Sequence, residues 1–145
     1  GKCVYKMDND VVDHQTVNML MEDGVTVSFQ MVAFSNLFTR GLRVMGSEGE
    51  LWGNFKKREL YFQRWGEEEQ KIDLEALCED FSGHGGGDLR LVMDFVEFVE
   101  GGKPSISCTQ LTDSINGHMI VFAADHALQQ KRRIDLAEYF EASKK

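Results

Sequence analysis

The hydrophobic period of this chain changes at one place, the glycine run at residues 83–88. Before the glycine run, apolar and polar residues alternate, most clearly in residues 25–31, which is the period of two typical of a strand with one face on a core. After it, apolar residues recur at spacings of three and four, which is the period of an amphipathic helix: Leu89, Val92, Met93, Val96 and Val99. Strands followed by helices define the α+β class, which we therefore expect.

Six segments of the first part are predicted as strands. Residues 15–22 and 25–34 flank Glu22-Asp23-Gly24, and an Asp-Gly turn between such runs is a strong hairpin signal. The other four segments follow at short intervals: 40–46, 49–55, 59–65 and 70–74. Connections this short permit antiparallel pairing only, so we expect an open, mainly antiparallel meander.

The second part predicts a helix over 88–100 that ends at Gly101 and Gly102. A longer helix is expected from Thr112 or Asp113 to about residue 130, followed by a short segment at 134–140. We expect the helices to pack on one face of the sheet. With 145 residues the chain is long enough to bury a core, and we predict that residues 1–145 form a single domain.

Composition excludes several classes of function. The net charge is −8, with 24 acidic and 16 basic side chains, which argues against a nucleic-acid partner because phosphate binding needs a clustered positive face. No apolar run approaches the roughly 20 residues that span a bilayer, and no signal-peptide pattern opens the chain, so we expect a cytoplasmic protein without membrane association. Cys3, Cys78 and Cys108 are odd in number and widely spaced, which predicts reduced thiols rather than disulfides or a zinc site.

The glycine run carries the most promising binding residues. His84 stands between glycines, where an imidazole that titrates near neutral pH can reach a ligand, or simply bond to nearby backbone. Asp88 occupies the expected N-cap position of the following helix, and we favour capping over an acid role. His14 could reach a pocket, although a structural hydrogen bond beside Asp13 is the favoured interpretation. No local spacing supports a metal site.

Other candidates are more ordinary. His118 is expected to be a satisfied, partly buried histidine within the second helix, and His126 to lie in a core or an interface. Trp52 and Trp65 could stack on a sugar ring, but aromatic residues on strands more often fill a core or a subunit interface, and we favour the interface for part of the set.

Four motifs in sequence order carry a resemblance to a known family: residues 10–15, residues 43–51, the glycine run, and the helical pattern of Ser114, His118 and residues 123–125. Together they resemble the C-terminal domain of the glucose–fructose oxidoreductase / inositol dehydrogenase / MocA family, over nearly the whole chain. The resemblance implies a dehydrogenase C-terminal-domain-like sheet that shapes a sugar or cyclitol pocket. It also implies homo-oligomers that form through the sheet face.

In that family an N-terminal Rossmann domain of the same polypeptide binds NAD or NADP. This chain has no Gly-x-Gly-x-x-Gly pattern between a strand and a helix, and no Glu-Lys-Pro lysine, since its only proline follows Lys103. We therefore expect neither catalytic nor cofactor-binding residues in this chain, and we expect it to be inactive by itself. The resemblance places His84, Gly85, Asp88 and His14 in contact with a sugar-like substrate.

Three functions stay open from the sequence. The first is the substrate-binding and oligomerisation domain of an NAD(P)-dependent oxidoreductase. The second is the same domain in an NAD-dependent glycosidase, which oxidises its sugar transiently and recycles the cofactor. The third is a stand-alone sugar-binding or scaffold module, which predicts sugar affinity in the isolated chain.

Overall fold

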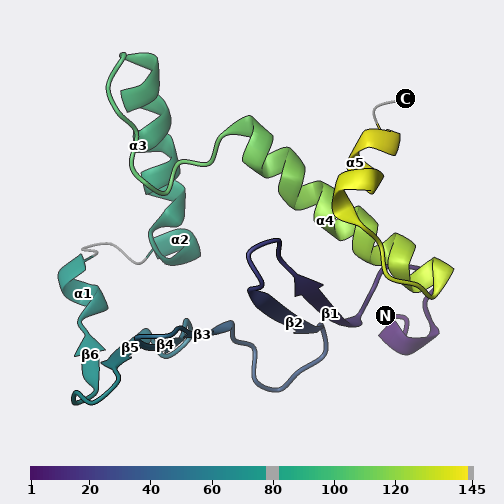
Figure 1. Cartoon of the computed structure of the whole chain (residues 1–145), viewed down its shortest axis with the longest axis horizontal. Helices are drawn as coiled ribbons and strands as arrows, with labels where there is room; N and C mark the ends of the chain where they lie inside the picture. The colour runs from purple at the N-terminus through teal and green to yellow at the C-terminus, as the bar shows by residue number, and fades with distance from the viewer. Residues whose placement is uncertain (78–81, 144–145) are drawn as a thin grey trace. The chain divides into compact units, whose positions relative to one another are not determined.

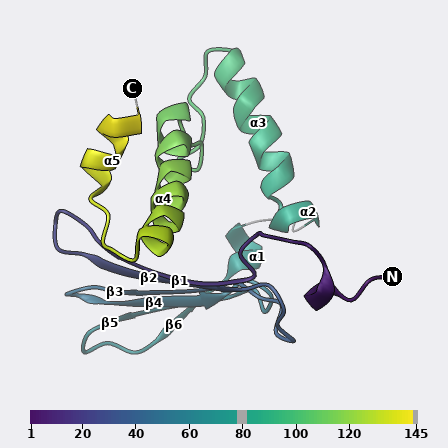
Figure 2. The same ribbon diagram turned by 90° about the vertical axis from the view of Figure 1, so that its right-hand side faces the viewer.

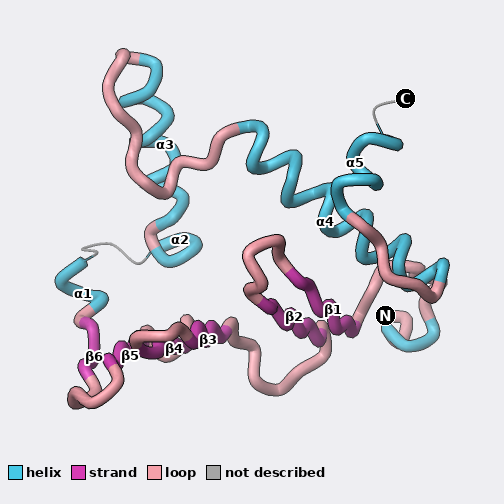
Figure 3. The backbone as a smooth tube through the Cα atoms, in the orientation of Figure 1, coloured by secondary structure: helices cyan, strands magenta, loops and turns pink. Residues whose placement is uncertain are grey.

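The computed structural model describes residues 1–77 and 82–143, drawn by secondary structure in Figure 3. Its contacts divide the chain into two compact units, Gly1–Ile72 and Asp73–Lys145. The first unit contains every strand of the described residues, and the second contains their α-helices. The α+β class and the antiparallel pairing of the strands are thereby confirmed. Cys78, one of the three cysteines considered above, lies outside the described residues.

The first unit opens with the short 3-10 helix η1 (Val4–Lys6) and a two-stranded hairpin of β1 (His14–Leu20) and β2 (Thr26–Val32). The predicted turn closes the hairpin, with the amide of Gly24 donating to the carbonyl of Met21 at 3.0 Å. The register sets five apolar residues of the two strands on one face, as their period of two requires: Val17, Met19, Val27, Phe29 and Met31.

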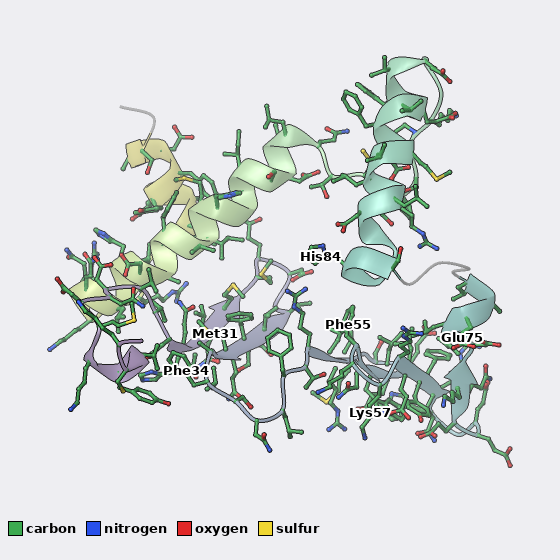
Figure 4. The ribbon with its side chains drawn as sticks, turned by 180° about the vertical axis from the view of Figure 1, so that it is seen from behind. Met31, Phe34, Phe55, Lys57, Glu75 and His84 are labelled. Atoms are coloured by element: carbon green, nitrogen blue, oxygen red, sulfur yellow. The ribbon has the colours of Figure 1, made fainter. Side chains whose placement is uncertain are left out.

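A separate four-stranded sheet follows, made of β3 (Gly41–Met45), β4 (Gly49–Asn54), β5 (Glu59–Arg64) and β6 (Gln70–Ile72). Each strand pairs antiparallel with the next, so the predicted meander is confirmed, although the six strands form two sheets. Phe55 and Lys57, labelled in Figure 4, lie in the turn between β4 and β5. One face of this sheet is almost wholly apolar: Leu42, Val44, Leu51, Leu60, Phe62 and Ile72.

The strand predicted over 70–74 ends earlier, at Ile72. Asp73 is the physical reason, because its carboxylate accepts the amides of Glu75 at 2.9 Å and Ala76 at 3.2 Å. These bonds satisfy first-turn donors of α1 (Leu74–Leu77), a helix that the sequence analysis did not predict.

The second unit continues with α2 (Ser82–Gly85), α3 (Gly87–Val99), α4 (Leu111–Gln130) and α5 (Leu136–Ser143), coloured teal to yellow in Figure 1. The two predicted helices therefore start and end within a few residues of α3 and α4. Helix α5 overlaps the segment 134–140, for which no helix was predicted. Helices α4 and α5 lie side by side in both Figure 1 and Figure 2.

Two sets of hydrogen bonds stabilise the C-terminal end of α3 and the loop that follows it. Gly101 adopts a left-handed φ of 83°, and the amides of Gly101 and Gly102 donate to the carbonyls of Phe98 and Glu97 at 3.1 and 2.8 Å. This is the Schellman pattern, and it confirms the predicted glycine stop. The loop after α3 is also bonded to the helix. Ser105 donates its backbone amide and its hydroxyl to the carboxylate of Asp94 in α3, at 2.8 and 2.6 Å.

Little apolar surface is buried within either unit. Ala123 in α4, 3% exposed, is the one buried apolar side chain among the residues that the structure describes. Large side chains on α3 are open, Phe95 and Phe98 among them, and so are Val27, Phe29 and Val32 of the hairpin. Patches of this extent are typical of surfaces that contact other protein. Within the described ranges, no helix has the length and apolar character needed to cross a bilayer.

Candidate functional site

The glycine run places an imidazole and a carboxylate together at the start of α3. His84 Nδ1 lies 2.9 and 3.1 Å from the two carboxylate oxygens of Asp88. Both side chains are open, at 83% and 63% exposure. Figure 4 shows His84 standing out from the turn of α2. Such a pair holds one ring nitrogen and leaves Nε2 accessible to a ligand.

Glycines make this pairing possible. Gly83 has φ 57° and ψ −136°, a backbone region that side chains with a Cβ avoid, and a Cβ on Gly83 would collide with the carboxylate of Asp88. Gly86 then takes φ 84° and is itself buried. The backbone therefore bends tightly enough between α2 and α3 for the side chains of His84 and Asp88 to face each other.

The predicted capping role of Asp88 is wrong. The N-cap of α3 is Gly86, which makes no side-chain bond, and Asp88 is already inside the first turn. Its carboxylate faces His84, and the hydrogen bond from His84 holds the pKa of Asp88 below its ordinary value, against a smaller upward effect of burial. The physical cause is Gly86, whose left-handed conformation starts the helix early enough to free the carboxylate.

The remaining predicted site residues differ in their settings. Gly85 lies in the same loop with φ 69°, and open space surrounds the position of a Cβ. His14 belongs to the first unit, where its Nδ1 lies 2.5 Å from a carboxylate oxygen of Asp13 and its side chain is 84% exposed. The favoured structural hydrogen bond of His14 is thereby confirmed. The structure thus brings together His84, Gly85 and Asp88 at the junction of α2 and α3.

The histidines of α4 have structural partners. His118 Nδ1 lies 2.7 Å from the carbonyl oxygen of Ser114, so it is satisfied as predicted, but it is exposed rather than partly buried. His126 is half-buried and its ring lies 5.5 Å from that of Tyr139 in α5. His118 therefore has one ring nitrogen bonded within its own helix, and the ring of His126 packs against α5.

A second polar cluster lies on the first unit, on the face of β3–β6 opposite to the apolar one. Arg43, Trp52, Tyr61 and Lys71 are direct cross-strand neighbours on successive strands. The Trp52 and Tyr61 rings stack with centroids 5.7 Å apart and planes inclined by 14°, and the Lys71 ammonium lies 5.8 Å from the Tyr61 centroid. We call these four residues the aromatic row. Such contacts stabilise a sheet modestly and orient its side chains.

Beside the aromatic row lies a concavity of about 310 Å³ that the sequence analysis did not anticipate. Its lining side chains come from three strands and the turn before β6: Arg43, Glu50, Trp52, Gln63 and Glu69. Arg43 forms an ion pair with Glu50, which raises the pKa of the guanidinium through a hydrogen bond and charge attraction. In the sequence, only the alternation of polar residues along these strands pointed to this cluster, because alternate residues of a strand lie on the same face of the sheet.

Metal ligands are not gathered anywhere in the parts that the structure describes: no cluster of three or more His, Cys, Asp or Glu side chains is placed to hold an ion. Cys3 and Cys108 are exposed free thiols. Comparison with protein-family models, curated proteins and solved structures found no match to this chain.

Proposed function

We propose that this chain is the substrate-binding and oligomerisation domain of an NAD(P)-dependent oxidoreductase that acts on a sugar or cyclitol. The motif resemblance leads to this class of enzyme. The observation that supports a substrate role is the His84–Asp88 pair, whose contact at 2.9 Å orients an otherwise open imidazole. An imidazole oriented in this way can donate to, or accept from, a sugar hydroxyl close to the reacting carbon.

The cofactor belongs to a separate N-terminal Rossmann domain in this proposal. NAD or NADP bound there accepts or delivers the hydride, while this chain supplies part of the substrate pocket wall. Oligomers form through a sheet face, whose open apolar residues are suited to a partner surface. By itself the chain is expected to show no turnover of any polyol with NAD or NADP, and turnover would contradict the proposal.

The first experiment is the intact mass of the native gene product. A mass well over twice 16.5 kDa leaves room for a Rossmann domain of about 150 residues and supports the proposal. A native mass near 16.5 kDa contradicts it, because no cofactor domain would then be present. Accumulation of NADH during turnover separates a dehydrogenase from a glycosidase that recycles its cofactor.

The second experiment tests His84 within that intact protein. His84→Ala should lower kcat/KM by about tenfold, because a lost hydrogen bond to the substrate costs about 0.5–1.5 kcal/mol. The matched control is His118→Ala, because His118 is also exposed but bonds to the carbonyl of Ser114 in its own helix. Equal losses in both variants would mean that His84 has no particular role at the substrate.

A further inference from the structure

We propose that the outer edge of β2, the edge that faces away from β1, pairs antiparallel with β2 of a second copy of this chain through backbone hydrogen bonds. The site lies wholly within the first unit and shares no residue with the glycine run or with the β3–β6 sheet. It is a strand edge rather than a sheet face. The proposal is therefore independent of the function proposed above, and either can fail without the other.

The backbone groups on this edge are identified by the hydrogen bonds at the two ends of the β1–β2 hairpin. At one end the amide of Met21 donates to the carbonyl of Val25 at 2.9 Å. At the other end the amide of Ala33 donates to the carbonyl of Asp13 at 2.7 Å. Because bonded and non-bonded pairs alternate between antiparallel strands, the odd residues of β2 bond to β1 and the even ones point away. In the chain that the structure describes, the outward backbone groups pair with no other strand: those of Thr26, Ser28, Gln30 and Val32.

This edge lacks the features that normally prevent a strand from pairing with another chain. Edge strands are usually protected by charged side chains, proline, bulges or short length. Residues 26–32 contain neither a charged residue nor proline, and they pair with β1 through seven consecutive residues without a bulge. The outer strands of the β3–β6 sheet are protected, since β3 carries Arg43 and β6 has three residues that include Lys71. A two-stranded hairpin is also marginally stable by itself and gains from a further strand.

The sequence of β2 is complementary to itself in one antiparallel register. When residue 26 pairs with residue 32 of the second copy, all seven residues of both strands are paired, and Phe29 lies opposite its own copy on the two-fold axis. The apolar face then continues across the interface, because Val27 lies opposite Met31 of the second copy. Val27 and Phe29, 38% and 48% exposed, pack against these neighbours. Aromatic and apolar cross-strand pairs of this kind stabilise a sheet.

The polar face and the charges of the turns are compatible with the same register. Ser28 lies opposite Gln30 of the second copy, so a hydroxyl meets a side-chain amide. Antiparallel pairing also places the two acidic turns, each with Glu22 and Asp23, at opposite ends of the interface. This separation matters because the net charge of −8 opposes association of two copies.

The outer edge of β1 is less suited to self-pairing. In the corresponding register Val17 would lie opposite its own copy, but Gln15 would lie opposite Met19 and interrupt the apolar face. The odd residues of β1 are already half-buried, whereas Val27 and Phe29 of β2 are exposed and have more apolar surface to cover. Both differences favour β2 as the interface.

The test is residue-resolved hydrogen exchange of the full chain, measured by NMR as the protein concentration is raised. Pairing of one strand makes a small interface, for which we expect a dimer dissociation constant on the order of 100 µM. Exchange of the outward amides of β2 should then slow about fourfold between about 20 µM and about 1 mM. The amides of Val27, Phe29 and Met31 should be protected already at the lowest concentration, because they bond to β1 within each copy. Sedimentation equilibrium should show the mass rising above 16.5 kDa over the same range.

Two matched variants separate the two edges of the hairpin. Gln30→Pro removes an outward amide of β2 and places a ring toward the second copy, so the concentration dependence should vanish. Thr16→Pro makes the same change on β1, at the residue directly opposite Gln30, and should leave the dimer intact. Neither amide bonds within the hairpin, and the remaining amide signals verify that it is folded. Ser28→Lys keeps every backbone bond and should weaken association about fivefold, because a charge on an edge disfavours pairing.

Several results would overturn the proposal. The first is that the outward amides of β2 stay unprotected up to about 1 mM, well above the expected dissociation constant. The second is equal protection at every concentration, because another part of the same chain would then cover the edge. Equal loss of association in Gln30→Pro and Thr16→Pro, or an unchanged dimer in Ser28→Lys, would place the interface on another surface, such as the apolar face of β3–β6.

Discussion

The end of α3 offers a sharp test of the backbone argument, because two glycines of the second unit should respond in opposite ways to the same substitution. Gly101 has φ 83° at the end of α3, whereas Gly117 lies within α4 and has no positive φ. A Cβ added at either position meets no atom within 4 Å. Neither alanine substitution therefore causes a steric collision, and the two positions differ in their backbone conformation.

The expected magnitudes follow from that difference. In Gly101→Ala, a left-handed residue with a Cβ costs about 1–2 kcal/mol, and the reduced freedom of the unfolded chain returns about 0.4–1 kcal/mol. The net loss is about 1 kcal/mol. In Gly117→Ala, helix propensity raises the free energy of unfolding by about 1 kcal/mol. The two variants should therefore differ by about 2 kcal/mol, or about thirtyfold in the folding equilibrium.

The assay is urea unfolding of the full chain followed by far-UV circular dichroism, with each variant compared with the unaltered protein. Hydrogen exchange adds a local readout, because the amide of Gly102 donates to Glu97 only while the left-handed turn persists, and it should exchange faster in Gly101→Ala. Equal shifts of both variants in one direction would refute the reasoning, since conformation would then not decide the sign.

Three further predictions concern single bonds and angles. Lys131 ends α4 with φ 51°, so Lys131→Gly relieves about 1–2 kcal/mol of left-handed strain. The greater freedom of glycine in the unfolded chain and the lost cation at the helix end take back part of this, so the free energy of unfolding should rise by about 0.5 kcal/mol. An unchanged or lower urea midpoint would contradict this. His84→Ala removes the bond that lowers the pKa of Asp88, so an NMR titration should give a higher Asp88 pKa than in the unaltered chain. Because folding depresses this pKa, the stabilisation is present above the unfolded-state value and is lost as pH falls through the folded one. Ser105→Ala should likewise raise the pKa of Asp94, which the serine hydroxyl and amide lower, while the pKa of Asp88 stays constant as the control.

Elements with a local cause were predictable from the sequence. The alternation of residues 25–31 and the turn at Gly24 predicted the β1–β2 hairpin, because both signals act within a few residues. The end of α3 was predictable for the same reason, since Gly101 readily takes the left-handed angle that closes a helix. The packing of helices on one face of the sheet stays a prediction.

The role of Asp88 was not predictable from capping rules alone. Any of the glycines before it could start α3, and which one takes the left-handed angle depends on the whole loop. Once Gly86 does so, Asp88 falls inside the helix, and its nearest polar group is the imidazole of His84. The His-x-x-x-Asp spacing alone does not predict this contact, because the left-handed Gly85 and Gly86 interrupt the helix between the two residues.

The concavity was missed for a different reason, which is register. Arg43 faces Trp52 only because the connection between β3 and β4 closes with the amide of Gly46 donating to the carbonyl of Gly49 at 2.8 Å. A slip by one residue would move Arg43 to the apolar face and remove the ion pair with Glu50. Alternation predicts which residues of one strand share a face, but not which residues of the next strand stand opposite.

The two faces of β3–β6 therefore suit different partners. The apolar face, with Leu51 and Phe62 near its centre, gains stability when other apolar protein surface covers it. On the polar face, a flat apolar partner would strip water from Gln63 and Glu69, and each buried group left unpaired costs about 1–3 kcal/mol. This difference in cost is the physical reason to expect the proposed assembly on the apolar face of β3–β6 rather than on the polar one.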